Sequence, residues 1–361
     1  MNAARIAAGL ALACSVSLGI GCVEPLAGPS GATDRASLFD DLWQQVDLHY
    51  SFFELKHIDW DSIGARYRPR ALAATSDTAF ADVLGRMLAE LKDVHVSLTS
   101  TTAGVPDRYL SSADTAAAFF SAQLVSEHYV PQSRSTVGGH VRYGMPTPTV
   151  GYVFIRSFEG TSWANELDDA LRELSGATSV VVDVRNNLGG TYTLASDMAG
   201  RFADRKRTFG YIRRRNGPAH DDFTDYLAET VQPSGPAQFH GPVYVLSNRR
   251  NFSTAEDFVL AMRALPNVTV VGERTAGASG GPIVRELANG WTYQVSEWIE
   301  YTPRRETFEG VGLAPDTLVK ATVADAARNV DPILERALTI AANRARPNMV
   351  ALPDVHRSPR Q

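Results

Sequence analysis

Cysteine is scarce in this sequence, because the 361 residues contain only Cys14 and Cys22. Cys14 lies inside an apolar N-terminal stretch with the features of an export signal, so a mature chain that begins at Cys22 would have no partner for an internal disulfide. Stability must therefore come from a packed core. With 44% hydrophobic residues, the chain has the composition to form one.

An excess of positive charge is also missing. The chain has 35 Lys and Arg against 40 Asp and Glu, a formal net charge of −5. Nucleic-acid binding needs a concentrated cationic surface, so this partner is not predicted. None of the eight histidines falls into a metal-ligand spacing such as HExxH. We therefore predict no metal site from the histidines.

The N-terminus indicates export. Arg5 precedes an apolar run over residues 6–20, which is too short and too weakly flanked to predict a membrane span. The stretch Leu18-Gly19-Ile20-Gly21-Cys22 resembles a lipobox, although the pattern usually has leucine where Gly19 stands. We expect residues 1–21 to be a signal peptide and Cys22 to be lipidated, which would attach the chain to a membrane of the bacterial cell envelope. Ordinary secretion is the alternative.

Residues 22–36 are rich in Pro, Gly, Ser and Ala and are predicted to be a flexible tether. Residues 37–98 are predicted to form a small helical module, since apolar residues recur there at helical spacing. These are Phe39, Leu42, Trp43, Val46 and Tyr50, followed by Phe80, Val83, Leu84, Met87, Leu88 and Leu91. Residues 99–149 hold many turn-forming residues and are predicted to be a variable segment of loops with a pair of strands.

The second half of the chain alternates between strand and helix patterns. Residues 150–155 and 179–184 are β-branched runs with an amphipathic stretch between them, and residues 243–271 repeat this strand, helix, strand order. Such βαβ units predict an α/β domain with a parallel sheet over residues 150–345. A polar tail over residues 346–361 follows.

Ser253 is a candidate nucleophile. It follows a strand by a short loop and begins a helix, where backbone N–H groups and the helix dipole stabilise developing negative charge. The stretch Ser253-Thr254-Ala255-Glu256 equally fits a helix capping box, in which the serine only caps the helix and the glutamate reaches back to it. The residues by themselves leave both interpretations open.

Two further stretches could complete such a site. Gly189 and Gly190 follow a strand, and their N–H groups could form an oxyanion hole together with that of Thr254, although a plain strand-to-helix turn explains them too. His95 follows the second predicted helix, and a neutral imidazole there could accept a serine proton. Because the chain has eight histidines, an ordinary surface or core residue is the alternative interpretation of His95.

The order of these motifs resembles the C-terminal processing (tail-specific) proteases, and most closely their tricorn-core branch. The resemblance covers most of residues 38–320. The motifs that carry it are Phe39-Asp40-Asp41-Leu42-Trp43, Leu91-Lys92-Asp93-Val94-His95, VDVRNNLGG ending at Gly190, Ser253 to Glu256, VGERTAG at 271–277, and EGVGLAPD at 309–316.

This resemblance implies a fold and a set of roles. The fold would be a crotonase/ClpP-like spiral of βα units, preceded by the helical module. Ser253 would be the nucleophile, His95 the general base and Glu309 the acidic member that orients the site. The N–H groups of the Gly189-Gly190 turn and of Thr254 would face the oxyanion. The reaction would be hydrolysis of a peptide or protein substrate through an acyl-enzyme, which needs neither a metal nor an organic cofactor.

Two departures from the family narrow the mechanism. The processing-protease branch uses a serine–lysine dyad, but Gly277-Ala278-Ser279 stands where the lysine would be, so that mechanism is not expected. Residues 99–149 are also too few for the peptide-binding PDZ domain that many relatives insert.

The clusters of arginine suggest a further, weaker interpretation. Arg213, Arg214 and Arg215 could bind the C-terminal carboxylate of a substrate, since guanidinium groups bind carboxylates well, although charge runs usually lie on solvated faces. Two other functions use the same residues: a binding protein for a peptide or apolar ligand on the same fold, and a hydrolase of a non-peptide acyl substrate. The sequence does not indicate an oligomeric state.

Overall fold

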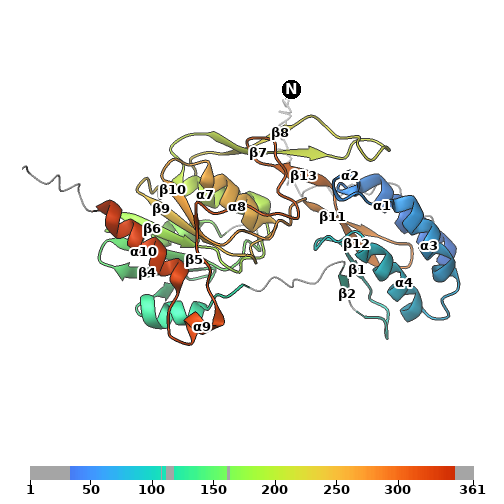
Figure 1. The fold of residues 1–361 in the computed structure, drawn as a ribbon, viewed down its shortest axis with the longest axis horizontal. Helices are drawn as coiled ribbons and strands as arrows, with labels where there is room; N and C mark the ends of the chain where they lie inside the picture. Colours follow the sequence, from blue (N-terminus) through green and yellow to red (C-terminus); the bar gives the residue numbers. More distant parts are fainter. Residues whose placement is uncertain (1–32, 107, 111–117, 161–162, 346–361) are drawn as a thin grey trace, which may run out of the picture.

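The computed structural model describes residues 33–345 except 107, 111–117 and 161–162. The predicted signal peptide, Cys22, most of the tether and the polar tail lie outside the described residues. The described part forms two lobes, a larger one around a mixed sheet and a smaller one that carries the N-terminal helices (Figure 1). Among the described residues, no helix is long and apolar enough to cross a membrane.

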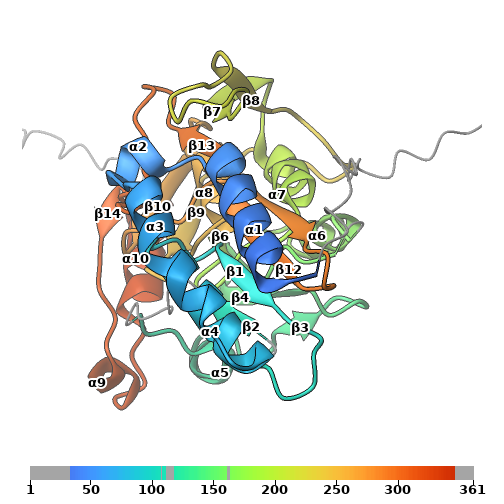
Figure 2. The same cartoon turned by 90° about the vertical axis from the view of Figure 1, so that its right-hand side faces the viewer.

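The smaller lobe consists of four helices packed on a four-stranded antiparallel sheet of order β11-β12-β1-β2. Asp34, Asp59 and Ser76 cap the three longer helices with their side chains. In Figure 2, α1, α3 and α4 lie in front of this sheet. The elements are α1 (Arg35–His49), α2 (Phe53–Lys56), α3 (Trp60–Leu72), α4 (Asp77–Ala89), β1 (Ser97–Thr99), β2 (Arg108–Leu110), β11 (Pro282–Glu286) and β12 (Thr292–Ser296).

The smaller lobe is therefore not contiguous in the sequence. Its apolar core joins residues of the predicted helical module to Leu287, Trp291, Tyr293 and Val295, which belong to the segment predicted as part of the α/β domain. A pattern of local periodicity does not reveal such a pairing, because the partners lie about 200 residues apart in the chain.

The larger lobe is built on a seven-stranded sheet of order β14-β10-β9-β6-β5-β4-β3. Its five strands from β14 to β5 run parallel, and β4 and β3 are antiparallel additions at one edge. This confirms the predicted α/β fold with a parallel sheet. The strands are β3 (Arg134–Ser135), β4 (Val141–Thr147), β5 (Val150–Ile155), β6 (Ser179–Asp183), β9 (Val243–Ser247), β10 (Val268–Gly272) and β14 (Thr317–Leu318).

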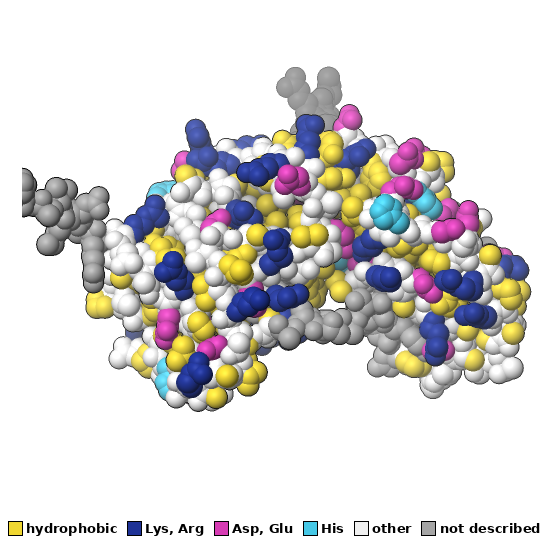
Figure 3. All heavy atoms as spheres, viewed as in Figure 1, with side chains coloured by type: hydrophobic (Ala, Val, Ile, Leu, Met, Phe, Trp, Pro, Cys, Tyr) yellow, Lys and Arg dark blue, Asp and Glu magenta, His cyan; other side chains and the backbone are white. Residues whose placement is uncertain are grey.

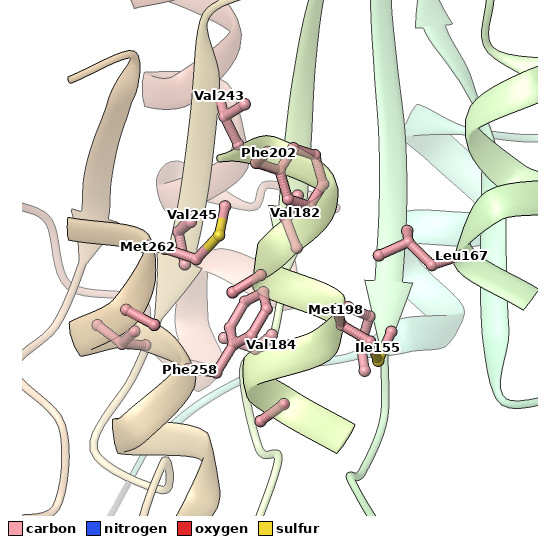
Figure 4. Close-up of a cluster of buried hydrophobic side chains, with 14 of the residues drawn as sticks. Ile155, Leu167, Val182, Val184, Met198, Phe202, Val243, Val245, Phe258 and Met262 are labelled. Atoms are coloured by element: carbon pink, nitrogen blue, oxygen red, sulfur yellow. The ribbon is translucent and has the colours of Figure 1, made fainter. Parts of the chain in front are cut away.

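Successive side chains of each strand point to opposite faces of this sheet, so both faces are covered. In β6, Val180 and Val182 pack with α6 (Asn165–Glu173), α7 (Tyr192–Ala199) and α8 (Thr254–Arg263), whereas Val181 packs on the opposite face with α10 (Pro332–Ala345). Figure 4 shows the first of these clusters, with Phe258 and Met262 of α8 against the valines of β6 and β9.

The remaining elements are short or lie at the periphery. An antiparallel sheet of order β13-β7-β8 forms an arm above the larger lobe in Figure 1. Its strands are β7 (Arg207–Arg214), β8 (Leu227–Val231) and β13 (Trp298–Tyr301). The other peripheral elements are α5 (Ala122–Leu124), the π-helical segment η1 (Val125–Tyr129), the 3₁₀ turn η2 (Gly200–Phe202) and α9 (Val323–Ala326). The face seen in Figure 3 shows cationic and acidic side chains interspersed over both lobes.

The core of the larger lobe predicts a stability contrast. Phe258 is 0% exposed and packs against Phe158 with ring centroids 5.2 Å apart, so Phe258→Ala should lower the free energy of unfolding by about 3–5 kcal/mol. Val323 is 73% exposed, and Val323→Ala should change it by less than about 0.5 kcal/mol. Denaturant titrations measure both, and equal midpoints for the two variants would contradict this packing.

Candidate active site

Ser253 sits in a strained backbone conformation at the start of α8. Its φ is 55° and its ψ is −140°, a region that residues other than glycine rarely adopt and that concentrates at active sites. The strain is held by backbone hydrogen bonds: the Ser253 N–H donates to the Ala278 carbonyl at 2.9 Å, and the Glu256 N–H donates to the Ser253 carbonyl at 2.6 Å.

The capping-box interpretation does not describe this site. The Ser253 side chain makes no capping hydrogen bond. The Glu256 carboxylate accepts instead from Thr275 Oγ1 at 2.5 Å and from the Gly277 and Ala278 N–H groups at 2.8 Å. Glu256 therefore anchors the 275–278 loop, and the Ala278 carbonyl of this loop accepts from the Ser253 N–H. The Ser253 hydroxyl does not cap the helix.

Ser253 lines a cavity of about 1030 Å³ at the junction of the two lobes. Thr254, Gly189 and Gly190 line it from the larger lobe, and His95 and Gln294 from the smaller one. The structure thus brings into one pocket the predicted nucleophile, base and oxyanion-hole residues, which are spread over about 160 positions of the chain.

His95 is held by Asp93. The backbone N–H of His95 donates to Asp93 Oδ1 at 2.8 Å, and His95 Nδ1 lies 3.6 Å from the same oxygen, an ion-pair distance. The other carboxylate oxygen of Asp93 accepts from Ser296 Oγ at 2.8 Å. Within the described residues, neither ring nitrogen of His95 has a hydrogen-bond partner. The imidazole is therefore oriented by a carboxylate and keeps a nitrogen for a serine proton.

The Gly189-Gly190 turn passes so close to its neighbours that only glycine fits, with Gly189 against the start of α8 and Gly190 against Phe158. A Cβ on Gly189 would lie 2.9 Å from the Thr254 nitrogen, and one on Gly190 would lie 2.2 Å from the Phe158 carbonyl carbon. Both residues have positive φ, 91° and 141°. Thr254 Oγ1 donates to the Gly190 carbonyl at 2.7 Å and so fixes the turn against α8.

One predicted oxyanion donor is already occupied. The Gly189 N–H donates to Asn187 Oδ1 at 2.9 Å, so Gly189 supplies space for the close approach and not a free N–H. The Gly190 and Thr254 N–H groups donate to no acceptor among the described residues. These two remain the candidates for an oxyanion hole.

Comparison with known proteins agrees with this geometry. A model of peptidase family S41 matches residues 149–319, and a model of the tricorn protease C1 domain matches residues 32–89. A crystal structure of a peptidase candidate from Parabacteroides merdae is 32% identical, has a TM-score of 0.74, and is matched over 84% of this chain and 95% of its own. The chain belongs to peptidase family S41.

Curated relatives of this S41 protein are similar over a part of their length. A carboxyl-terminal-processing protease of Synechocystis is 28% identical over 202 residues, which are 55% of this chain and 45% of the relative. The carboxy-terminal processing protease CtpA of Bacillus subtilis is 29% identical over 188 residues, 51% of this chain and 37% of the relative. The chain thus spans less than half of these relatives, and the resemblance found in the sequence is confirmed.

Solved structures with lower identity share the fold. Mature CPAF complexed with lactacystin has a TM-score of 0.65 at 12% identity, covering 85% of this chain and 97% of its own. The tricorn protease has a TM-score of 0.56 at 16% identity, covering 86% of this chain and 36% of its own. The fold is thus shared with proteins that have only 12% and 16% sequence identity to this chain.

Asparagines that the sequence analysis did not select hold the two S41 motifs together. The Asn186 N–H donates to Asn248 Oδ1 at 3.1 Å, and Asn248 Nδ2 donates to Asn186 Oδ1 at 2.8 Å. Asn251 donates to the Val184 carbonyl and accepts from the Asn248 N–H. The sequence does carry a signal for these contacts, because the asparagines lie in two loops that each follow a buried strand. Parallel strands end at the same edge of the sheet, so their loops lie close together.

Glu309, the predicted acidic member of the site, acts on His95 through its charge. Its carboxylate lies 2.9 Å from Lys56 Nζ and accepts from the Ser279 N–H at 2.8 Å and from Ser279 Oγ at 3.1 Å. Burial and the charge of Asp93 raise the pKa of Glu309 to about 7, against the lowering by Lys56. The residue in direct contact with His95 is Asp93, which the sequence analysis quoted in its motif without giving it a role.

The arginine cluster lies on the arm. Arg213 donates to the Thr224 carbonyl, Arg214 pairs with Glu297 at 3.1 Å, and Arg215 donates to the Tyr50 carbonyl at 2.9 Å. None of the three is among the residues that line the active-site cavity. Their contacts therefore give no support to the predicted binding of a substrate carboxylate, which stays a prediction.

The surroundings of His95 predict a pH profile. Burial lowers the pKa of His95, but the neighbouring carboxylate of Asp93, with the charges of Glu309 and Glu300, raises it above the ordinary value of 6.5. Because only neutral imidazole accepts a proton, kcat/KM should fall as the pH drops, with a midpoint above 6.5. Asp93→Asn should move this midpoint to lower pH, because it removes the charge that raises the pKa of His95, and should reduce the maximal rate by roughly 10²-fold or more.

The matched variant is Glu309→Gln, which removes a charge that acts on His95 less strongly than that of Asp93. It should move the midpoint less. A larger displacement for Glu309→Gln than for Asp93→Asn would show that Asp93 is not the carboxylate that controls the base.

Proposed function

We propose that this protein is a serine-type peptidase that hydrolyses peptide bonds through an acyl-enzyme. The observation that carries the proposal is the shared pocket: Ser253 at a strained helix start and His95 with unpartnered ring nitrogens line one cavity with the Gly190 turn. Membership of family S41 and the names of the curated relatives support the same activity.

The chemistry follows from the residues. His95 takes the proton of the Ser253 hydroxyl as the oxygen attacks the substrate carbonyl, and the Gly190 and Thr254 N–H groups donate to the oxyanion that forms. His95 then gives its proton to the leaving amine, and the C–N bond breaks. A water molecule, deprotonated by His95, releases the acyl group as a carboxylic acid and returns the serine.

Asp93 and Glu309 act on the base and not on the substrate. The Asp93 carboxylate accepts from the backbone N–H of His95 and lies at ion-pair distance from its ring. It stabilises the imidazolium that forms in each step. Glu309 adds negative charge to the same neighbourhood. Glu256 keeps Ser253 in place by anchoring the loop to which its N–H is bonded.

A soluble form that starts after Cys22 tests this function. Incubation with a mixed peptide library should give cleavage products by mass spectrometry, and a fluorophosphonate should label Ser253. Ser253→Ala and His95→Ala should each lower the cleavage rate by about 10⁴-fold or more, because each removes a group that the proposed acyl transfer requires.

The alternatives give different results in the same experiment. Labelling of Ser253 without peptide cleavage would indicate a hydrolase of another acyl substrate. If the protein shows no labelling of Ser253 and no peptide cleavage, the proposal is overturned. The result would favour a protein that binds a peptide or apolar ligand on the S41 fold.

We also propose that the protein is exported and anchored at the bacterial cell envelope through a lipid on Cys22. The support is the apolar stretch over residues 6–20 and the lipobox-like sequence before Cys22. The Pro- and Gly-rich residues that follow would act as a spacer between the membrane and the folded lobes.

Lipidation is tested by growth of an expressing bacterium with an alkyne-tagged fatty acid. The wild type should take up the label and sediment with membranes, whereas Cys22→Ala should be unlabelled and should be found in the soluble envelope or medium fraction. Cys14→Ala is the control and should leave the label in place. A labelled Cys22→Ala protein would contradict the proposed anchor.

A further inference from the structure

A second cavity, of about 480 Å³, lies next to the active-site cavity. Val94 and Phe252 line both cavities, and they directly precede His95 and Ser253 in the chain. The proposed chemistry gives no role to the cationic side chains of this second cavity, which we call the cationic cavity. Its charged lining residues are five cationic and two acidic ones: Lys56, Lys92, Arg249, Arg274 and Lys320 against Glu273 and Glu309.

The two carboxylates do not balance the positive charge of this cavity. Glu309 is paired with Lys56 at 2.9 Å. Glu273 is buried and lies near two cations: burial raises its pKa, whereas the backbone N–H and charge of Arg249 and the charge of Lys320 lower it. Five cations against two carboxylates leave an excess of three positive charges, although the whole chain carries a net charge of −5. The cavity is therefore a local cationic site on an acidic protein.

Most of these cations are accessible to a ligand. Lys92, Arg249, Arg274 and Lys320 are exposed. Within the described part of the chain, the side chains of Lys92, Arg249 and Lys320 take part in no hydrogen bond or ion pair. Arg274 donates through Nη1 to the Gly312 carbonyl at 2.8 Å and keeps its other N–H donors. Such donors around one hollow favour a ligand with several carboxylate or phosphate oxygens.

The form of the site favours a polypeptide over a membrane as the source of these oxygens. Lipid headgroups present a surface, to which protruding basic segments bind, whereas these cations line a hollow. Val311 and Leu318 line the same hollow and are 59% and 66% exposed. They provide apolar area for the aliphatic parts of a peptide, so an acidic peptide segment matches both kinds of lining.

The chain itself limits how far the cationic cavity lies from the reacting groups. Arg249 precedes Ser253 by four residues, and Lys92 precedes His95 by three. Consecutive Cα atoms are about 3.8 Å apart, so these pairs of Cα atoms are separated by at most about 15 and 11 Å. An extended peptide rises about 3.3 Å per residue. A substrate residue about four or five positions from the scissile bond therefore reaches the cationic cavity.

We propose that the cationic cavity is an exosite, a binding site outside the catalytic pocket, for an acidic segment of the polypeptide substrate. Lys92, Arg249 and Lys320 donate to aspartate or glutamate side chains about four or five positions from the scissile bond. The site selects substrates by charge and takes no part in bond cleavage. This inference rests on the proposed peptidase function and names a substrate class for it.

The test uses the soluble form that starts after Cys22 and peptides built around one mapped cleavage site. Matched peptides carry either glutamates or glutamines about four to six positions from the bond, in one set on its N-terminal side and in another on its C-terminal side. In one of the sets, kcat/KM for the glutamate peptide should exceed that for the glutamine peptide by roughly 10-fold, mainly through KM. This ratio should fall towards one in about 0.5 M NaCl, because salt screens exposed charges.

A double variant tests the residues. Arg249→Ala with Lys320→Ala should lower the ratio by about threefold or more and leave kcat/KM for the glutamine peptide unchanged, because only the charge of the cavity changes. Arg205→Ala with Lys206→Ala is the matched control. It removes the same two kinds of charge from exposed, described residues that line neither cavity, so the ratio should stay at its wild-type value.

A binding measurement separates this site from the catalysis. The Ser253→Ala form should bind a fluorescein-labelled glutamate peptide roughly 10-fold more tightly than its glutamine counterpart by fluorescence anisotropy, and Arg249→Ala with Lys320→Ala in that background should reduce the difference. Equal binding of the two peptides would overturn the exosite, whether or not the wild type cleaves peptides. Absence of fluorophosphonate labelling of Ser253 and of cleavage would instead overturn the peptidase function.

Two further results would also overturn the exosite. The first is a wild-type ratio near one in both peptide sets, or an equal effect of the double variant and its control. The second is binding of phosphatidylglycerol vesicles that the double variant abolishes while glutamate and glutamine peptides are cleaved alike, which would assign the cationic cavity to the membrane.

Discussion

The antiparallel pairing of β1 with β12 is the contact on which the active site depends. Ser97, two residues after His95 in the chain, pairs with Gln294. His95 is thereby fixed beside a strand from the C-terminal half of the chain. Ser296 at the end of β12 reinforces this pairing, because its hydroxyl donates to Asp93 and its carbonyl accepts from the Ser51 N–H. The orientation of His95 is therefore a property of a sheet that joins two distant parts of the chain and not of one local motif.

A second constraint holds the nucleophile. The N–H of Ser253, whose φ is positive, is bonded to the Ala278 carbonyl, and the Ala278 N–H is in turn bonded to the buried carboxylate of Glu256. Glu256 lies three residues after Ser253, so the helix that begins at the serine also supplies the group that secures it. The cost of burying this carboxylate is visible in its pKa, which burial raises to about 8 against three hydrogen bonds that lower it. Strain and a buried acid are thus combined in one short stretch of sequence.

The α/β fold, the parallel sheet and the identity of the S41 motifs could be predicted because each depends on local periodicity or on short motifs in a fixed order. The roles within the site were less accessible. The Ser253–Glu256 spacing fits a capping box, and only the loop at 275–278 reveals that the glutamate has other partners. The Gly189 N–H looked equivalent to that of Gly190, yet Asn187 occupies it. Asp93 was overlooked because one carboxylate in a motif of ordinary residues carries no mark of its contact with His95.

By itself the sequence determined the order of the elements, the positions where strands end in loops, and the residues at those ends, because backbone propensity and side-chain alternation act over a few neighbouring residues. Tertiary structure alone decided which of those ends meet. It placed β11 and β12 with the N-terminal helices, brought Lys92, Arg249 and Lys320 to one cavity, and assigned Glu309 to Lys56 and Ser279. The physical reason is that hydrogen bonds and charge interactions depend on distance in space, whereas a sequence records only distance along the chain.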